Sequence, residues 1–155
     1  MKLGFNGSEY SFRWTDGSQY EFVPPAQSDL STWRDMLTIN FHETASTGEK
    51  LAEVANRVLS TYQKHGKVVR TNSKPRTASE PAEHLVVAVL GDREFLEAAF
   101  ARILLVDAVG TVVVYSHRIY GKPAGAGMSE WLDKNGTQVE DALMKWWVPS
   151  LASLQ

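Results

Sequence analysis

Hydrophobic and polar residues alternate near the start of the chain, which is the pattern of strands with one buried face. Residues 10–14 and 20–22 both alternate aromatic with polar side chains. Asp16 and Gly17 lie between the two segments and favour a tight turn. The pattern predicts a hairpin that ends at residues 23–25, because the two prolines there cannot continue a strand.

Another strand and an amphipathic helix are predicted next. Residues 37–41 carry apolar side chains at every second position, as in a strand with one buried face. Between residues 49 and 65 the apolar residues recur at helical spacing, namely Leu51, Val54, Ala55, Val58, Leu59 and Tyr62. Ser46 and Glu49 form a capping-box pair at the start of this helix, and Gly66 is a stop signal. A helix with one apolar stripe is expected to cover a sheet.

The middle of the chain predicts a meander of strands. Residues 68–69 suggest a short strand, and the polar residues 71–83, with two prolines, suggest a long exposed loop. Residues 85–90 and 112–115 are apolar or β-branched, as expected of strands. Residues 95–106 are ambiguous, because several of them favour a helix by propensity. Turn-like linkers on both sides favour the strand, which we predict.

The C-terminal part is predicted to be helical. A first short apolar face spans residues 128–132, and Asn135-Gly136 interrupts it. Thr137 and Glu140 form a second capping-box pair. The helix that follows has its apolar face at Val139, Leu143, Trp146 and Trp147.

These elements predict an α+β fold in a single domain over residues 1–155. We expect a predominantly antiparallel sheet of about six or seven strands. One long amphipathic helix and the C-terminal helices are expected to pack on it.

Charge and composition exclude several classes of function. Sixteen Lys and Arg residues against eighteen Asp and Glu give a net charge of −2, so nucleic-acid binding is disfavoured. The absence of cysteine excludes disulfides, thiolate nucleophiles and cysteine-bound metal clusters. No segment has the apolar length needed to span a bilayer. We expect a periplasmic or exported protein whose signal peptide is absent from this sequence, or otherwise a cytoplasmic one.

Residues with catalytic chemistry do not form a recognisable motif. His42-Glu43 lacks the second histidine of a zinc-protease motif. Ser116 and His117 are neighbours on a predicted strand, so their side chains point to opposite faces and cannot act as a pair. The glycine-rich residues 121–129 match no phosphate-binding motif and are expected to form a connector. We predict no catalytic residue, no cofactor and no metal site.

Candidate binding residues are aromatic or lie near the end of the meander. Tryptophan is enriched at interface hot spots, so Trp131, Trp146 and Trp147 are candidates for contacting a partner, although core packing also explains them. His117 and Arg118 are the other two candidates. An alternative is a small-ligand or hydrolase-like site assembled from the meander residues His84, Glu97, Arg102, His117 and Arg118.

The order of the predicted elements resembles the Mog1/PsbP-like group of α-β-α sandwiches, which includes DcrB-like domains. The resemblance rests on the hairpin that ends at residues 23–25, the strand over residues 38–41, the helix from Glu49 to His65 and the meander that ends at residues 113–118. Members of this group are mostly non-enzymatic and bind a larger protein or assembly. The resemblance implies a bacterial accessory or protein-binding domain, expected to be a monomer. A small acidic secretion chaperone is a related alternative, which would be expected to dimerise.

Overall fold

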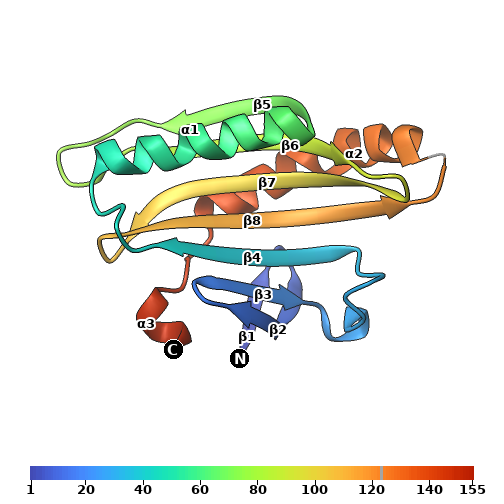
Figure 1. The fold of residues 1–155 in the computed structure, drawn as a ribbon, viewed down its shortest axis with the longest axis horizontal. Coiled ribbons are helices and arrows are strands. Elements are labelled where there is room, and N and C mark those ends of the chain that lie inside the picture. Colours follow the sequence, from blue (N-terminus) through green and yellow to red (C-terminus); the bar gives the residue numbers. More distant parts are fainter. Residues whose placement is uncertain (123) are drawn as a thin grey trace.

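Eight antiparallel strands form one sheet within residues 1–122 and 124–155, which the computed structural model describes (Figure 1). In chain order the strands are β1 Lys2–Phe5, β2 Ser8–Asp16, β3 Gln19–Val23, β4 Asp35–His42, β5 Gly66–Lys74, β6 Glu83–Gly91, β7 Phe95–Val106 and β8 Val109–Tyr120. The helices are the short 3-10 helix η1 Pro25–Gln27, α1 Gly48–His65, α2 Ala124–Lys145 and α3 Leu151–Leu154. The α+β class and the antiparallel sheet are confirmed, whereas the expected number of strands was too low.

The order of the strands across the sheet is β1-β2-β3-β4-β8-β7-β6-β5. Consecutive strands pair within each half, and β4 joins the two halves by pairing with β8 from Asp35↔His117 to His42↔Gly110. The sequence missed the edge strand β1 and made the other edge strand, β5, too short, because it suggested a strand over residues 68–69 alone. β1 has only four residues, and β5 extends through part of the segment that the sequence suggested to be a loop.

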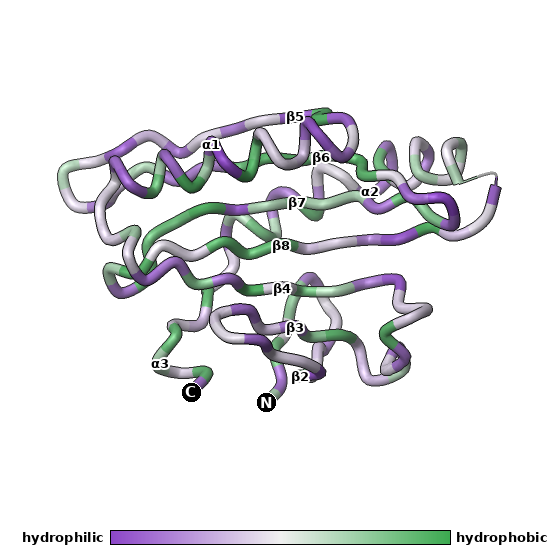
Figure 2. Tube along the Cα trace, in the orientation of Figure 1, coloured by the Kyte–Doolittle hydropathy of each residue, from purple (hydrophilic) through white to green (hydrophobic). Residues whose placement is uncertain are grey.

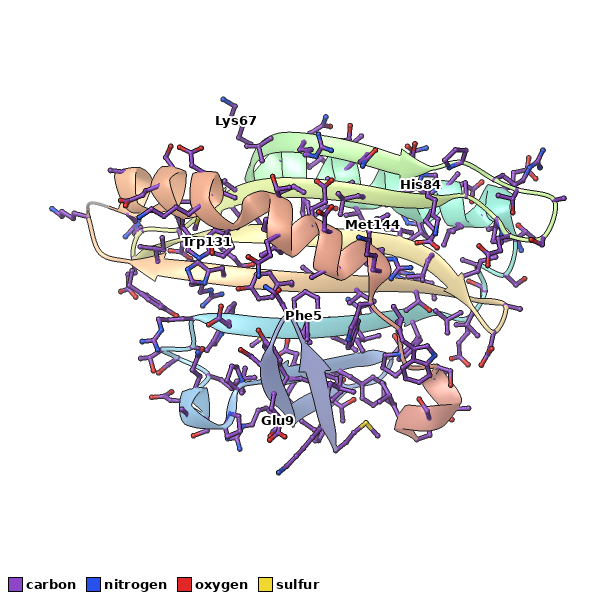
Figure 3. The ribbon with its side chains drawn as sticks, turned by 180° about the vertical axis from the view of Figure 1, so that it is seen from behind. Phe5, Glu9, Lys67, His84, Trp131 and Met144 are labelled. Carbon is purple, nitrogen blue, oxygen red and sulfur yellow. The ribbon has the colours of Figure 1, made fainter. Side chains whose placement is uncertain are left out.

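The larger hydrophobic core lies between the sheet and α2. It includes Leu37, Phe100 and Leu143, which are at most 1% exposed. The N-terminal strands extend this core, because Phe5 of β1 packs against Tyr115 of β8 with ring centroids 5.5 Å apart. Figure 3 shows Phe5 on the same side of the sheet as α2.

A smaller core lies under α1 on the opposite face of the sheet. Leu51 and Val54 of α1 pack there against apolar side chains of β6, β7 and β8. The apolar stripe predicted for this helix is thereby confirmed, and Figure 2 shows hydrophobic and hydrophilic residues alternating along it. The helix begins one residue later than the capping-box pair suggested, because Thr47 is the cap, and its side chain accepts a hydrogen bond from the Lys50 amide at 3.2 Å.

The preference for a strand over residues 95–106 was correct. Strand β7 pairs along its whole length with β8, from Phe95↔Tyr120 to Val106↔Val109. Asp107 and Ala108 form the tight turn between them, both with positive φ, as in the turns that connect twisted hairpins. Tertiary pairing here outweighs the helical propensity of the individual residues.

The predicted break at Asn135-Gly136 was wrong, because α2 runs through it without interruption. The buried residues Met128, Val139 and Leu143 keep their helical spacing on both sides of the glycine, so packing on the sheet holds the helix together. Most of the glycine-rich segment after β8 also belongs to this helix. Trp146 and Trp147, in contrast, lie beyond its end at Lys145.

Candidate functional site

The candidates His117 and Trp131 lie against each other on the α2 face of the sheet. His117 comes from β8 and Trp131 from α2, and their rings stack with centroids 4.2 Å apart and planes 9° from parallel. Trp131 also packs edge-on against Phe100, with ring centroids 6.2 Å apart. The stack joins the helix to the sheet near the far end of β8.

Beneath this stack, the carboxylate of Asp35 on β4 accepts three side-chain hydrogen bonds. Tyr115 Oη donates to Asp35 Oδ1 at 2.6 Å, His117 Nδ1 lies 2.9 Å from the same oxygen, and Gln27 Nε2 donates to Oδ2 at 3.0 Å. A carboxylate only accepts, so His117 Nδ1 carries the proton. Burial alone raises the pKa of Asp35, but these hydrogen bonds and the nearby imidazole outweigh it and lower the pKa to about 2.

Two buried phenols respond to this charge in the opposite direction. Burial raises the pKa of Tyr115 far above its ordinary value, and the negative charge of Asp35 raises it further. Tyr10 of β2 is shifted in the same direction, mainly by burial and then by the same carboxylate. Both hydroxyls therefore stay protonated, and that of Tyr115 serves as a hydrogen-bond donor.

An aspartate beside a histidine and a tyrosine could in principle perform acid–base chemistry. Here both carboxylate oxygens are already bonded, and the imidazole face is covered by Trp131. The side chain of His117 is only 14% exposed. We call this arrangement a structural lock, because Asp35 joins β4 to β8 through its hydrogen bonds and the stack of His117 on Trp131 joins β8 to α2.

Arg118 follows His117 in the chain but lies on the opposite face of the sheet. Its Nε donates to Glu97 Oε1 at 2.8 Å, across the β7–β8 pair. The guanidinium also lies between two aromatic rings, 3.8 Å from the centroid of Phe95 and 4.1 Å from that of Trp33. Its charge is thus neutralised by a carboxylate and covered by cation–π contacts.

The other two tryptophans have contrasting surroundings. Trp146 Nε1 donates to the carbonyl of Gly4 at 2.7 Å, and its ring packs edge-on against Phe5. It therefore fastens β1 to the end of α2. Trp147 is 74% exposed and is the candidate tryptophan that a partner could reach directly.

The five meander residues of the alternative site do not converge. Glu97 and Arg118 pair with each other, whereas Arg102 lies on the other face, where its Nε donates to Glu83 at 2.8 Å and its Nη1 to the Leu143 carbonyl at 3.0 Å. His84 follows Glu83 in β6, but it lies on the opposite face of the sheet, beside α1. Within residues 1–122 and 124–155, no three or more histidine and acidic side chains are grouped so that they could hold a metal ion.

The full length of β5 and its position at the edge of the sheet are features that the sequence did not reveal. Its backbone pairs only with β6 in the described part of the chain, and nearly all of its residues are exposed. A bulge at Val69 interrupts the pairing between Val68 and Arg70. The bulge also breaks the alternating pattern, which is why this segment did not look like a long strand.

Three basic residues of β5 lie on the face that α2 covers. Lys67, Arg70 and Lys74 are paired with Val89, Val87 and Glu83 of β6, and residues directly opposite each other in a sheet share a face. Figure 3 shows Lys67 pointing away from the ribbon at this edge. Arg70 binds Glu140 of α2 through two hydrogen bonds, one of them from Nη2 to Oε2 at 3.0 Å. Neither lysine has a carboxylate within 4.0 Å among the described residues.

A crevice of about 440 Å³ lies between this edge and α2. Val87, Phe100 and Leu132 line it with apolar surface, and the Arg70–Glu140 ion pair lies at its mouth. Val69, which is 46% exposed, connects the crevice to the strand edge. An apolar side chain beside a strand could enter it.

Comparisons with known proteins give the fold and nothing more specific. No protein-family model matches the chain, and no curated protein matches its sequence. Among solved structures, it is similar to the crystal structure of a protein of unknown function from Pseudomonas aeruginosa, with a TM-score of 0.54 at 10% identity over 97% of both chains. None of the described helices is both long and apolar enough to cross a membrane.

Proposed function

We propose that the protein is a non-enzymatic accessory domain that binds another protein. The observation that carries this proposal is the nine-residue edge strand β5, which pairs with β6 alone among the described strands and borders an apolar crevice. An open sheet edge offers main-chain hydrogen bonds to an extended segment, and an adjacent pocket adds specificity. Trp147, exposed just beyond the end of α2, is proposed as a second contact.

The side chains with potential chemistry support a binding role. Asp35, His117 and Arg118 are each engaged in hydrogen bonds or ion pairs within the fold, and aromatic rings also cover His117 and Arg118. A catalytic group has to reach a substrate atom at hydrogen-bond distance, and the carboxylate of Asp35 and Nε of Arg118 are already bonded within the fold.

The resemblance to the Mog1/PsbP-like group is also consistent with this proposal. A sheet with helices on both faces is the architecture that the resemblance implies, although fold similarity alone does not define function. We further propose that the protein is a monomer, because the basic edge strand disfavours pairing with a second copy. Gel filtration tests this, and elution as a dimer would contradict it.

The decisive experiment is quantitative affinity capture from a native extract of the source organism, followed by cross-linking and mass spectrometry. The full chain is used as bait, and a chain with a scrambled surface is the control. We expect one partner, retained in a stoichiometric amount by the native chain alone. If the folded protein retains nothing above the control, the proposal fails and a metabolite screen becomes the next step.

A further inference from the structure

We infer that β5 binds an extended, acidic segment of the partner, which adds to the sheet as a further strand. This inference rests on the proposed function and specifies the chemistry of the partner. It is carried by three observations: the free outer edge of the strand, the basic residues on one of its faces, and the crevice beside it.

The outer edge of β5 has backbone donors that are directed away from the sheet. Ser73 N donates to the Oδ1 atom of Asn72 at 2.9 Å, so this amide is satisfied by a neighbouring side chain rather than by β6. Amides of alternate residues point to the same side of a strand, so the Thr71 amide also points outward. An incoming strand would pair with these two groups and displace the Asn72 side chain from Ser73.

The charge of the edge selects an acidic segment. Lys67, Arg70 and Lys74 all lie on the α2 face of β5, and the strand contains no acidic residue. An added strand lies about 4.8 Å away, so its side chains on this face would lie opposite the lysines. On α2, Glu140 neutralises Arg70, which leaves Lys67 and Lys74 as the cations available to the partner.

The same charges argue against a second copy of the chain as the occupant. Antiparallel pairing of two β5 strands would place six cationic side chains along one join, and like charges opposite each other are destabilising. Lysines and bulges on an edge strand are known devices against self-association. The lysines of β5 would attract the carboxylates of an acidic strand, whereas they would repel the same lysines of a second copy.

Because the crevice is lined by apolar side chains, the bound segment is also expected to carry an apolar side chain. Side chains of the added strand that point toward α2 would pass Val69 and reach the opening in front of Val87 and Leu132. We therefore expect the segment to combine carboxylates with at least one aliphatic side chain on the same face. That combination would distinguish it from a generally acidic coil.

The probe for the test is a synthetic peptide as long as β5 that has threonine at every second position. The positions between carry glutamate and one central valine, so that the carboxylates and the aliphatic side chain share a face. Binding to the full chain is measured by fluorescence anisotropy, and hydrogen exchange of the Thr71 and Ser73 amides is measured by NMR. We expect saturable binding that weakens as salt is added, and slower exchange at both amides. A peptide of the same length with lysine in place of glutamate is the matched control and should not bind.

Charge reversal on the protein completes the test. We expect the Lys67→Glu/Lys74→Glu variant to bind the acidic peptide roughly ten- to thirtyfold more weakly. The Lys2→Glu/Arg13→Glu variant has the same net charge but is altered on β1 and β2, at the other end of the sheet, and should bind normally. Circular dichroism and thermal unfolding establish that both variants are folded.

Three outcomes would overturn the inference. The first is no binding of the acidic peptide at millimolar concentration, and the second is binding that leaves exchange at Thr71 and Ser73 unchanged. The third is binding of the wild type, but not of Lys67→Glu/Lys74→Glu, to anionic vesicles rather than to either peptide. If the charge-reversed variant still captures the native partner from the extract, the binding function stands and only the β5 assignment fails.

Discussion

Replacing Asp35 by Asn tests whether the buried carboxylate is the centre of a structural lock. The substitution keeps the size of the side chain and removes its charge. One oxygen remains for Tyr115 and His117, but the new amide nitrogen would face Gln27 Nε2, which is also a donor. Gln27 cannot simply reverse, because its oxygen already accepts the backbone amides of Arg34 and Asp35.

The size of the effect follows from the pKa of the carboxyl group. The hydrogen bonds in the folded protein lower the pKa of Asp35 from 3.8 to about 2, and each unit corresponds to about 1.4 kcal/mol. Because the side chain is 24% exposed, we reduce the resulting value to about 2 kcal/mol of stability from ionisation. The mismatched donors add to this cost, so we expect Asp35→Asn to lower the free energy of unfolding at neutral pH by about 2–3 kcal/mol.

The pH dependence has a definite sign. A carboxyl group with a lowered pKa in the folded state stabilises the protein at pH values above the pKa of the unfolded chain. For Asp35 that contribution is complete above about pH 4 and is lost as the pH falls through about 2. The stability difference between wild type and variant should therefore shrink across this interval.

Urea unfolding followed by tryptophan fluorescence, at several pH values, measures this difference. At neutral pH, thermal unfolding of the variant should occur about 5–10 °C lower than that of the wild type. Asp133→Asn, at an exposed position of α2, is the control and should change stability by less than about 0.5 kcal/mol. The proposed role of ionised Asp35 would be refuted if the stability difference between wild type and Asp35→Asn stayed constant from neutral pH to about pH 2. It would also be refuted if that difference were no larger than the effect of Asp133→Asn.

Three further substitutions test other parts of the fold by urea unfolding. Arg102→Met should lower the free energy of unfolding by about 3–5 kcal/mol, because it leaves the nearly buried carboxylate of Glu83 and two carbonyls near the end of α2 without their donor. A decrease below about 1 kcal/mol would contradict this. Gly66→Ala should destabilise the protein strongly, since a Cβ there would collide with the backbone of β6. Gly136→Ala in α2 meets open space and should stabilise the protein by about 0.5–1 kcal/mol. Equal effects of the two substitutions would contradict this contrast. Trp131→Ala should lower the free energy of unfolding by about 2–3 kcal/mol through its lost ring contacts, and exposed Trp147→Ala should lower it by less than about 0.5 kcal/mol. The reverse order would contradict the packed position of Trp131 and the exposed position of Trp147.

The elements that the sequence predicted well are those with one face against a core. β4 and α1 alternate apolar and polar residues with a regular period, because Leu37 and Leu51 each face a core while their neighbours face solvent. The strand over residues 95–106 could be chosen correctly because tight turns flank it. In each case the deciding information lies within a few residues of the element itself.

The elements that the sequence misjudged are shaped by contacts elsewhere in the chain. β5 is an edge strand with almost no buried residue, so no apolar period marks it. Gly136 usually weakens a helix, but packing on both sides of it outweighs that cost of about 1 kcal/mol. Local propensity carries no information about either effect.

Among the site residues, too, the sequence indicated some individual side chains but not the contacts between distant ones. His117 and Trp131 were both chosen, but their stacking could not be anticipated, because it depends on how α2 crosses β8. Asp35, which organises that region, was not chosen at all. It meets Tyr115 and His117 from 80 and 82 residues away, and no local pattern connects them.

The junction of β4 with β8 also has a consequence for how the chain folds. Among the described strands, this is the one pairing between strands that are not consecutive, and its partners are far apart in the chain, from Asp35↔His117 to His42↔Gly110. The four strands on each side can form from local contacts, whereas the junction requires closure of a long loop at an entropic cost. We expect the junction to be absent from the rate-limiting transition state, so that Asp35→Asn accelerates unfolding and leaves the refolding rate almost unchanged.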